Sequence, residues 1–327
     1  MNAPHELDGT LSAEMAELMD RVALETGPLP DPTTLPPAVG RAQTAQANLR
    51  WSVNLPPMQH ESEVWVEADD ALASARCRVR ILVPHNASNG AVLFVHGGGF
   101  AFCSPETHER CARVLAIQTG LPVLLPDYRL APEHPFPAGL KDVVAVLRAA
   151  FDASAAVGVT KGPLLVSGDS AGANLALAAM LHEQAASKTL PDGALLFYGN
   201  YAHVFDSPSY RRFADGPGLT LGKMQRYWAW YLADQTVADD PLACPLAASD
   251  EQLAGLPPLY LAAAAVDPLL SDTLRLHARL QAIGRNDELS VVSGVTHGFL
   301  QNTNELAAAR EVLAAAGLAA KRITKRR

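Results

Sequence analysis

Cysteine is scarce in this sequence, and its arrangement excludes the common metal and redox motifs. The four cysteines include no C-x-x-C spacing, which is typical of a zinc site or a redox dithiol. The ten histidines form no H-E-x-x-H pair, so the motif of a metalloprotease is also missing. We therefore expect no metal site, and we expect reduced thiols packed as small apolar side chains: Cys77, Cys103, Cys111 and Cys244.

Long apolar runs and an excess of positive charge are missing as well. No window has the uninterrupted apolar length of a membrane span, and Met1–Glu6 has neither the basic nor the apolar region of a signal peptide. We therefore expect a cytoplasmic protein without a membrane span. A net charge of −8 and an isoelectric point of about 5.7 argue against a nucleic-acid partner. The basic end Lys321–Arg327 is interpreted as a solvated tail after a helix.

Short apolar runs, by contrast, are frequent, and they predict a sheet. Two runs of alternating polarity, Glu63–Ala68 and Cys77–Val83, predict an antiparallel hairpin at one edge. A late run at Glu288–Val292 predicts the last strand. Continuously apolar runs predict parallel strands that are covered on both faces: Ala91–Val95, Pro122–Leu125, Leu164–Val166, Ala194–Tyr198 and Pro258–Ala264. Together they predict a mostly parallel, doubly wound sheet of eight strands in an α/β fold.

Helical patterns separate these runs and also precede them. The 327 residues, 49% of them hydrophobic, suit one large domain with an insertion or two domains. We expect N-terminal cap helices at 1–50 and a catalytic domain at 51–327. Within it, the aromatic segment at about 201–245 is either plain core or a cap insertion above a pocket. Helices are predicted at Ser12–Leu24, Pro37–Arg50, Thr107–Thr119, Ala138–Phe151, Ala173–Ser187, Leu221–Leu232 and Ser271–Ile283, and from about Asn304.

The pentapeptide Gly168–Gly172, with the sequence GDSAG, lies between a predicted strand and a predicted helix. A G-x-S-x-G in this setting is typical of a nucleophile elbow, a sharp turn that holds one serine above the edge of the sheet. Glycines flank the serine because a Cβ there would collide with the neighbouring backbone. Ser170 is therefore a candidate nucleophile. The alternative is a connecting turn with an exposed serine.

A serine nucleophile needs a base within hydrogen-bond reach, and the base needs a carboxylate that orients it. Asp267 directly follows an apolar strand, and His297 directly follows the last one. The chain order serine, acid, histidine is the order that this kind of elbow requires. Asp272, five residues further on, is interpreted as a favourable charge in the first turn of a helix. Taken alone, a histidine or an Asp-Pro after a strand also fits a plain surface turn.

A glycine-rich loop follows the predicted strand Ala91–Val95. It has the sequence HGGGF at His96–Phe100, which is where an oxyanion loop is expected. Glycines allow the backbone to approach a substrate and to turn its N–H groups inward. We predict that the N–H groups of Gly98, Gly99 and Ala171 stabilise the oxyanion. A phosphate cradle is the alternative, but no lysine follows in P-loop spacing.

Four motifs together resemble the hormone-sensitive-lipase-like family of microbial esterases, within the α/β-hydrolase superfamily. They are HGGGF at His96–Phe100, DYRLAPEHPFPA at Asp127–Ala138, GDSAG at Gly168–Gly172 and HGF at His297–Phe299. The resemblance covers about residues 63 to 300. It implies an α/β-hydrolase core with a helical cap, hydrolysis of short-chain carboxylic esters, and no cofactor. It also implies dimerisation through the last strand of the sheet, as in many relatives.

The family pattern places the catalytic triad on Ser170, Asp267 and His297, and the oxyanion glycines on Gly98 and Gly99. The chain departs from it mildly, because Phe100 stands where Trp or Tyr is common and the acid motif does not end in Asp-Glu. The implied substrate is a small uncharged ester. We predict pocket walls of aromatic and apolar character: Phe100, Cys103, Tyr201, Phe205 and Trp228.

The expected reaction is acyl transfer in two steps. Ser170 attacks the ester carbonyl while His297 takes its proton, and water then hydrolyses the acyl-enzyme. Activity should fall as His297 becomes protonated. The sequence leaves open a related bond, in an acetylated sugar, a lactone or an amide. It also leaves open a non-catalytic binding module that uses the same pocket.

Overall fold

The computed structural model describes residues 9–233 and 239–325. Its strands are β1 (His60–Val66), β2 (Cys77–Val83), β3 (Ala91–Val95), β4 (Val123–Pro126), β5 (Leu164–Asp169), β6 (Gly193–Phe197), β7 (Leu259–Val266) and β8 (Glu288–Thr296). They form one sheet in the order β1-β2-β4-β3-β5-β6-β7-β8. β1 and β2 are antiparallel to each other, β2 is antiparallel to β4, and the remaining pairs are parallel. The predicted eight-stranded sheet with an antiparallel first edge is confirmed.

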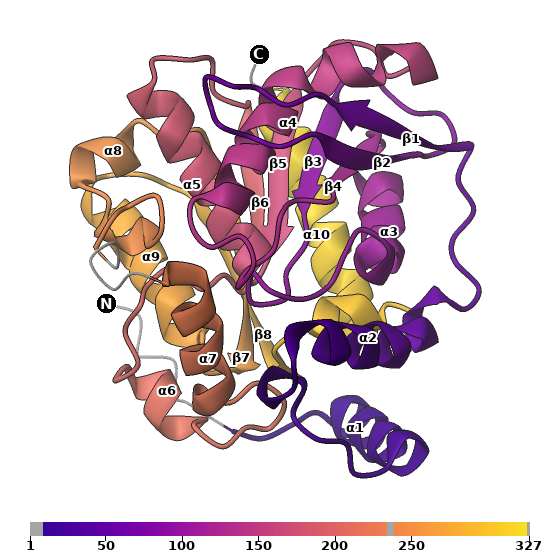
Figure 1. The fold of residues 1–327 in the computed structure, drawn as a ribbon, viewed down its shortest axis with the longest axis vertical. Helices are drawn as coiled ribbons and strands as arrows, with labels where there is room; N and C mark the ends of the chain where they lie inside the picture. The colour runs from indigo at the N-terminus through magenta and orange to yellow at the C-terminus, as the bar shows by residue number, and fades with distance from the viewer. Residues whose placement is uncertain (1–8, 234–238, 326–327) are drawn as a thin grey trace.

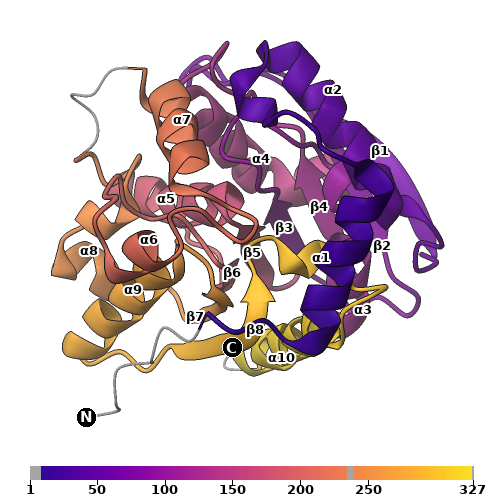
Figure 2. The ribbon, with the colours of Figure 1, turned by 90° about the horizontal axis from the view of Figure 1, so that it is seen from below.

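The helices cover both faces of this sheet (Figures 1 and 2). They are α1 (Ala13–Thr26), α2 (Pro37–Asn48), α3 (Glu109–Thr119), α4 (Ala138–Ser154), α5 (Ala171–Ala185), α6 (Pro208–Arg212), α7 (Leu221–Leu232), α8 (Asp250–Ala254), α9 (Leu270–Ala282) and α10 (Ala307–Thr324). One apolar layer contains Leu140 of α4, Leu175 of α5 and Leu276 of α9. The layer on the opposite face contains Leu115 of α3 and Leu313 of α10. Each such buried leucine contributes about 1.5–3 kcal/mol relative to an exposed one.

Two differences from the predicted elements have simple causes. β5 runs three residues beyond the predicted end at Val166, because Ser167, Gly168 and Asp169 pair with β6. The five-residue helices α6 and α8 were not expected from the sequence. Each begins at a serine whose side chain caps its first turn, Ser207 or Ser249. A helix of little more than one turn is too short to show a hydrophobic period.

The segments predicted as a cap lie at one end of the sheet. Figure 1 places α1, α2, α6 and α7 together at the lower end of the molecule, beyond the carboxyl ends of the parallel strands. The predicted ranges 1–50 and 201–245 include residues 1–8 and 234–238, which lie outside the described residues. The last two residues of the predicted basic tail also lie outside them.

Candidate active site

Ser170 occupies a strained turn between β5 and α5. Its φ of 55° and ψ of −121° lie in a region that a residue with a side chain rarely adopts. A Cβ added to Gly172 would overlap the carbonyl oxygen of Val95, and one added to Gly168 would overlap the backbone of Gly172. The glycines of GDSAG are therefore required by close packing of the backbone. This geometry is the predicted elbow, and it brings the Ser170 hydroxyl to the end of the sheet.

The structure brings Ser170, His297 and Asp267 together in a line of hydrogen bonds. Nε2 of His297 lies 2.9 Å from Oγ of Ser170, and Nδ1 of His297 lies 2.7 Å from Oδ2 of Asp267. Asp267 is fully buried, and its Oδ1 accepts the N–H of Leu269 at 2.9 Å. When Asp267 accepts a proton-bearing Nδ1, Nε2 of His297 is left to accept the serine hydroxyl. The arrangement can therefore move a proton away from Ser170.

The other carboxylate of this region, Asp272, has different partners. Its Oδ2 accepts the N–H groups of Tyr201 at 2.9 Å and Ala202 at 3.1 Å. It thereby joins the first turn of α9 to the chain that follows β6. Complete burial raises the pKa of Asp272 to about 7, despite these two N–H groups. Asp267, and not Asp272, is the acid that contacts His297.

The glycine loop reaches the same place from the end of β3. We call residues 96–101 the oxyanion loop. The N–H groups of Gly98, Gly99 and Ala171 donate no hydrogen bond within the part of the chain that the structure describes. Ala171 is the first residue of α5, where N–H groups have no partner inside the helix. The three predicted donors are thus available to a negatively charged oxygen, and the positive end of the α5 dipole favours such an oxygen.

Asp169, the residue before Ser170, holds the oxyanion loop in place. Its Oδ1 accepts the N–H of Gly97 at 2.9 Å and lies 3.2 Å from Nε2 of His108. Tyr198 donates its hydroxyl to Oδ2 at 3.4 Å. Burial by itself would raise the pKa of Asp169, but the charge and hydrogen bond of His108 and the N–H of Gly97 lower it below its ordinary value. The carboxylate is therefore ionised. Neither Asp169 nor His108 is predicted as a site residue by the sequence motifs.

A cavity of about 330 Å³ opens beside Ser170 and His297. One wall comes from α2 and the turn η2 (Leu49–Ser52), and another from α7. Lys223 and Asp169 are the charged groups at its walls besides the histidines, within the described residues. The lining residues are Thr44, Asn48, Trp51, Gly98, Gly99, Cys103, His108, Asp169, Ser170, Gly218, Leu219, Lys223, Met224, Tyr227, His297, Gly298 and Gln301.

Of the five predicted pocket walls, Cys103 lines this cavity and the other four do not: Phe100, Tyr201, Phe205 and Trp228. Phe100 is buried and stacks on Tyr231, with ring centroids 3.6 Å apart. Trp228 is buried next to it, with the two centroids 5.5 Å apart. The aromatic face of α7 at Trp228 and Tyr231 packs into the core with Phe100, so the prediction that Phe100 and Trp228 line the pocket is wrong.

The prediction that Tyr201 and Phe205 line the pocket is wrong as well, because Tyr201 lies in the core and the half-buried Phe205 packs against it. Tyr201 is completely buried, and the ring of Phe205 packs edge-on against Tyr210 at 5.5 Å. The helical period of α7 could have identified the residues that border the cavity. Lys223, Met224 and Tyr227 share one face of α7, and that face borders the cavity. The N-terminal segment is predicted as part of a cap, but nothing in its sequence indicates that Thr44, Asn48 and Trp51 are the residues that border the cavity.

Two further observations concern binding and location. Among residues 9–233 and 239–325, no group of three or more His, Cys, Asp or Glu side chains is placed to hold a metal ion. No helix in the same ranges is both long enough and apolar enough to span a lipid bilayer. The four cysteines are free thiols, as expected.

Comparison with known proteins defines the class of this chain. Residues 92–301 match the family model described as alpha/beta hydrolase fold. This range is more than half of the chain, and the chain belongs to that family. The predicted fold and the resemblance to hormone-sensitive-lipase-like bacterial esterases are confirmed.

Individual relatives cover most of the chain. The carboxylesterase NlhH of Mycobacterium tuberculosis is 35% identical over 222 residues, which are 67% of this chain and 69% of that protein. The acetyl esterase of Salmonella paratyphi B is 32% identical over 239 residues, 72% of each chain. A solved ester hydrolase from the metagenome of Lake Arreo, in complex with a bipyridine phosphonate derivative, has a TM-score of 0.87. It is 30% identical, and the match covers 95% of this chain and 98% of that one.

Proposed function

We propose that this protein hydrolyses short-chain carboxylic esters through a covalent acyl-enzyme on Ser170. Its curated relatives are named carboxylesterase, esterase and acetyl esterase, and the protein is a carboxylic-ester hydrolase. One observation carries the assignment of residues. It is the line of hydrogen bonds from Ser170 to His297 at 2.9 Å and from His297 to Asp267 at 2.7 Å, beside an open cavity.

The first step forms a bond between Oγ of Ser170 and the ester carbonyl carbon. His297 takes the hydroxyl proton on Nε2, while Asp267 keeps Nδ1 protonated and stabilises the imidazolium. The tetrahedral intermediate then collapses, the bond to the leaving alcohol breaks, and His297 gives its proton to that alcohol. In the second step water attacks the acyl-enzyme with His297 as the base, and the acid leaves.

The negative charge of the tetrahedral intermediate falls on the former carbonyl oxygen. The unpaired N–H groups of Gly98, Gly99 and Ala171 are our proposed donors to it. Hydrogen-bond donors that are already in position stabilise the charge that develops in the transition state, each by about 3–4 kcal/mol in comparable sites. The loop needs no reorganisation, because Asp169 already holds Gly97.

The size of the cavity supports a short acyl chain. A volume of about 330 Å³ is at the small end of the range for ligand pockets. We expect kcat/KM on 4-nitrophenyl esters to be highest for acetate to hexanoate and to fall for longer acids. Acetylated sugars, lactones and amides are the alternative substrates, and a non-catalytic binding module of the same fold is the alternative outside enzymes.

Replacement of Ser170 tests the proposal. Ser170→Ala should remove turnover of 4-nitrophenyl butanoate, because the histidine then has no hydroxyl to activate. Ser293→Ala, at an exposed serine of β8, is the matched control and should retain wild-type turnover. Ester hydrolysis by Ser170→Ala at the wild-type rate would contradict the proposal, and turnover of no ester by the wild type would favour the binding module.

The remaining expectations concern organisation and surroundings. We propose that the α1–α2 segment and the segment around α7 form the cap, since both border the cavity. Association of two copies through β8 stays a prediction. β8 pairs with β7, and within the described residues its other edge receives the N–H of Ser12 at Gly294. Light scattering of the purified protein tests the dimer. Four free thiols suit the predicted cytoplasm, which cell fractionation checks.

A further inference from the structure

Two hydrogen bonds with residues at or just after the ends of sheet strands hold the beginning of the oxyanion loop. The hydroxyl of Tyr128 donates to the carbonyl oxygen of His96 at 2.8 Å, and the N–H of Gly97 donates to Asp169 at 2.9 Å. The predicted donors, Gly98 and Gly99, come after both of these anchors. They adopt φ values of +114° and +60°, a region open to glycine, and the carbonyl oxygen of Gly98 accepts the N–H groups of Ala101 at 3.2 Å and Phe102 at 2.9 Å.

The end of the oxyanion loop is held from α2. Nε of Arg41 donates to the carbonyl oxygen of Ala101 at 2.7 Å. The same guanidinium donates to the carbonyl oxygen of Ala131 at 2.8 Å and forms an ion pair with Glu133 at 2.5 Å. The side chain of Arg41 is 27% exposed and that of Glu133 is 48% exposed, so water competes more for the ion pair than for the two part-buried bonds to the carbonyl oxygens. Arg41 thus joins three separate segments of the chain at the point where the loop ends.

The middle of the oxyanion loop is held from α7. A Cβ added to Gly99 would overlap Cγ, Cδ1 and Cδ2 of Tyr227, so the tyrosine ring lies directly against this glycine. The ring packs on its other side edge-on against Phe102, with centroids 5.8 Å apart. Tyr227 is therefore the group that limits movement of Gly99 toward the cavity. A ring can do this without its hydroxyl.

The two cap segments that supply these contacts are joined to each other. Arg226, the neighbour of Tyr227, pairs with Asp31 at 2.5 Å and donates Nε to the hydroxyl of Thr33 at 2.6 Å. Burial alone would raise the pKa of Asp31, but the hydrogen bonds from Thr33 and the charges of Lys223 and Arg226 lower it. Asp31 caps the short turn η1 (Pro32–Thr34), which contains Thr33 and leads into α2, so these contacts join the segment that carries Arg41 to the helix that carries Tyr227.

We propose that Arg41 and Tyr227 are positioning residues of the oxyanion hole, through which the joined cap segments hold the N–H groups of Gly98 and Gly99 in line with the reacting carbonyl. The proposal rests on the proposed ester hydrolysis and deepens it. It assigns the cap a part in transition-state stabilisation besides shaping the cavity. Misaligned donors lose much of their effect, and removal of one donor costs about 10²–10³ in kcat in comparable enzymes.

A comparison of oxygen and sulfur esters tests this role directly. The sulfur of a thionoester is a poor hydrogen-bond acceptor, so its rate depends little on the alignment of oxyanion donors. The quantity to measure is kcat for 4-nitrophenyl butanoate divided by kcat for its thiono analogue. Tyr227→Ala and Arg41→Met should lower this ratio by about 10-fold or more. Tyr227→Phe, which keeps the ring against Gly99, should keep the wild-type ratio.

The matched control is Met224→Ala, which enlarges the cavity from the same helix as Tyr227. It should raise KM and leave the ratio unchanged. Thermal unfolding of each variant separates a loss of folded protein from a loss of alignment. The proposal is overturned if Tyr227→Ala and Arg41→Met change KM or thermal stability but keep the wild-type ratio. Failure of the proposed function gives a different result: Ser170→Ala would then hydrolyse the oxygen ester as fast as the wild type.

Discussion

The carboxylate of Asp169 accepts the N–H of Gly97 at 2.9 Å, so the residue before the proposed nucleophile holds the loop that carries the proposed oxyanion donors. The nucleophile elbow and the oxyanion loop are thereby fixed relative to each other by one hydrogen bond. The ionised state of Asp169 depends on His108, whose Nε2 lies 3.2 Å away. Loop geometry in this active site is thus secured by a buried carboxylate and by the histidine that contacts it.

Asp169→Ala should lower kcat for 4-nitrophenyl butanoate by about 10–100-fold, because the oxyanion loop loses its anchor at Gly97. Asp169→Asn should lose less, since its amide oxygen still accepts that N–H. Steady-state kinetics of both variants, with thermal unfolding as a check on folding, make the comparison. Equal losses in the two variants would show that the hydrogen bond to Gly97 is not what matters.

The two buried carboxylates near His297 should differ sharply on replacement. Asp267→Asn should lower kcat by about 10⁴-fold, because the amide favours the wrong tautomer of the imidazole. Asp272→Asn should retain wild-type kcat, since the carboxylate contacts the N–H groups of Tyr201 and Ala202 through Oδ2 and does not contact His297. The measurement is kcat at pH 8 for both variants. If Asp272→Asn lowers kcat more than Asp267→Asn does, Asp267 is not the acid of the triad.

Asp272 should also make the stability of the protein depend on pH. Burial raises its pKa from 3.8 to about 7, so between these values the folded state holds a proton that the unfolded state has released. The free energy of unfolding therefore falls as pH rises from about 4 to 7, by on the order of 4 kcal/mol at 1.36 kcal/mol per pH unit. Above pH 7 this contribution is constant.

Denaturant unfolding between pH 4 and 8 measures this slope. The neutral amide of Asp272→Asn can still accept the N–H groups of Tyr201 and Ala202, so the variant should match the wild type near pH 4 and exceed its stability increasingly up to pH 7. The difference between the two curves isolates Asp272 from all other titrating groups. A variant that is less stable than the wild type at pH 8 would contradict this explanation.

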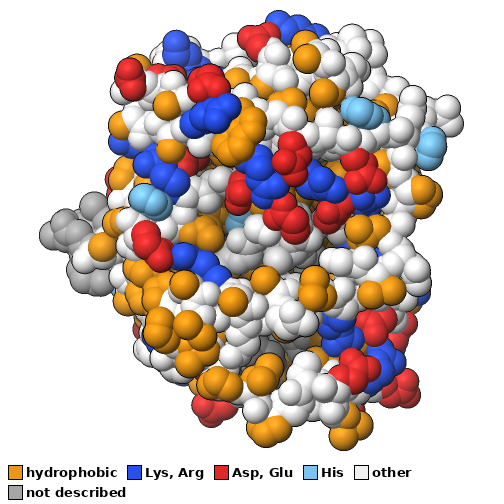
Figure 3. All heavy atoms as spheres, turned by 45° about the vertical axis from the view of Figure 1, so that its right-hand side comes forward, with side chains coloured by type: hydrophobic (Ala, Val, Ile, Leu, Met, Phe, Trp, Pro, Cys, Tyr) orange, Lys and Arg blue, Asp and Glu red, His pale blue; other side chains and the backbone are white. Residues whose placement is uncertain are grey.

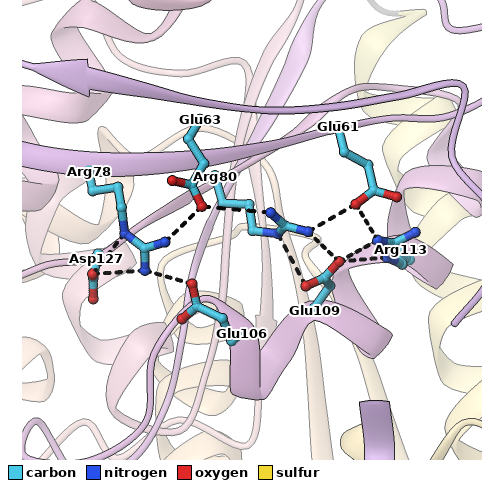
Figure 4. A network of polar contacts seen from close by, with 8 residues as sticks. All are labelled: Glu61, Glu63, Arg78, Arg80, Glu106, Glu109, Arg113 and Asp127. Atoms are coloured by element: carbon cyan, nitrogen blue, oxygen red, sulfur yellow. Dashed lines mark hydrogen bonds and ion pairs between the residues drawn. The ribbon is translucent and has the colours of Figure 1, made fainter. Parts of the chain in front are cut away.

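A network of charged side chains covers the antiparallel edge of the sheet. Figure 3 shows acidic and basic groups gathered on this face, and Figure 4 shows how they alternate between β1, β2, α3 and the loops beside them. Arg80 is at its centre, with bonds to Glu109 at 2.8 Å and Glu61 at 2.9 Å. Its members are Glu61, Glu63, Arg78, Arg80, Glu106, Glu109, Arg113 and Asp127.

Arg80→Met should lower the free energy of unfolding by about 1–3 kcal/mol, because it leaves the nearly buried Glu109 with one cation fewer. The matched control is Arg76→Met. Its pair with Glu67 is more than half exposed on both sides, so its loss should cost about 0.5 kcal/mol or less. Urea unfolding of the two variants at low and high salt tests the difference. If Arg80→Met and Arg76→Met lower the free energy of unfolding equally, the network contributes no more than ordinary surface ion pairs.

Local patterns in the sequence were enough to predict the sheet strands and the longer helices, and to propose the residues of the triad, but not the short helices α6 and α8. Cys77–Val83, Ala91–Val95 and Leu221–Leu232 have the same bounds in the sequence prediction and in the structure. Ser170, Asp267 and His297 could be found because each follows a strand, and the carboxyl ends of neighbouring parallel strands meet at one edge of a sheet.

The cavity walls could not be predicted in the same way. Asn48 and Trp51 line the same cavity as Ser170, which lies more than a hundred residues further along the chain, and nothing in their own segment singles them out as wall residues. Aromatic character was also a poor guide. Trp228 fills the core while its neighbour Tyr227 borders the cavity, so the orientation of α7 decides their roles. That orientation depends on packing against Phe100.

The nucleophile is the centre of this account, and a covalent label tests it most directly. A 4-nitrophenyl phosphonate ester should react once per chain with release of nitrophenolate, and peptide mass spectrometry should place the added phosphonyl group on Ser170. The adduct mimics the tetrahedral intermediate, so its formation requires both the activated serine and the oxyanion donors. Ser170→Ala should remain unlabelled. Labelling of another residue, or an unmodified Ser170 in protein that has lost its esterase activity to the reagent, would contradict the account.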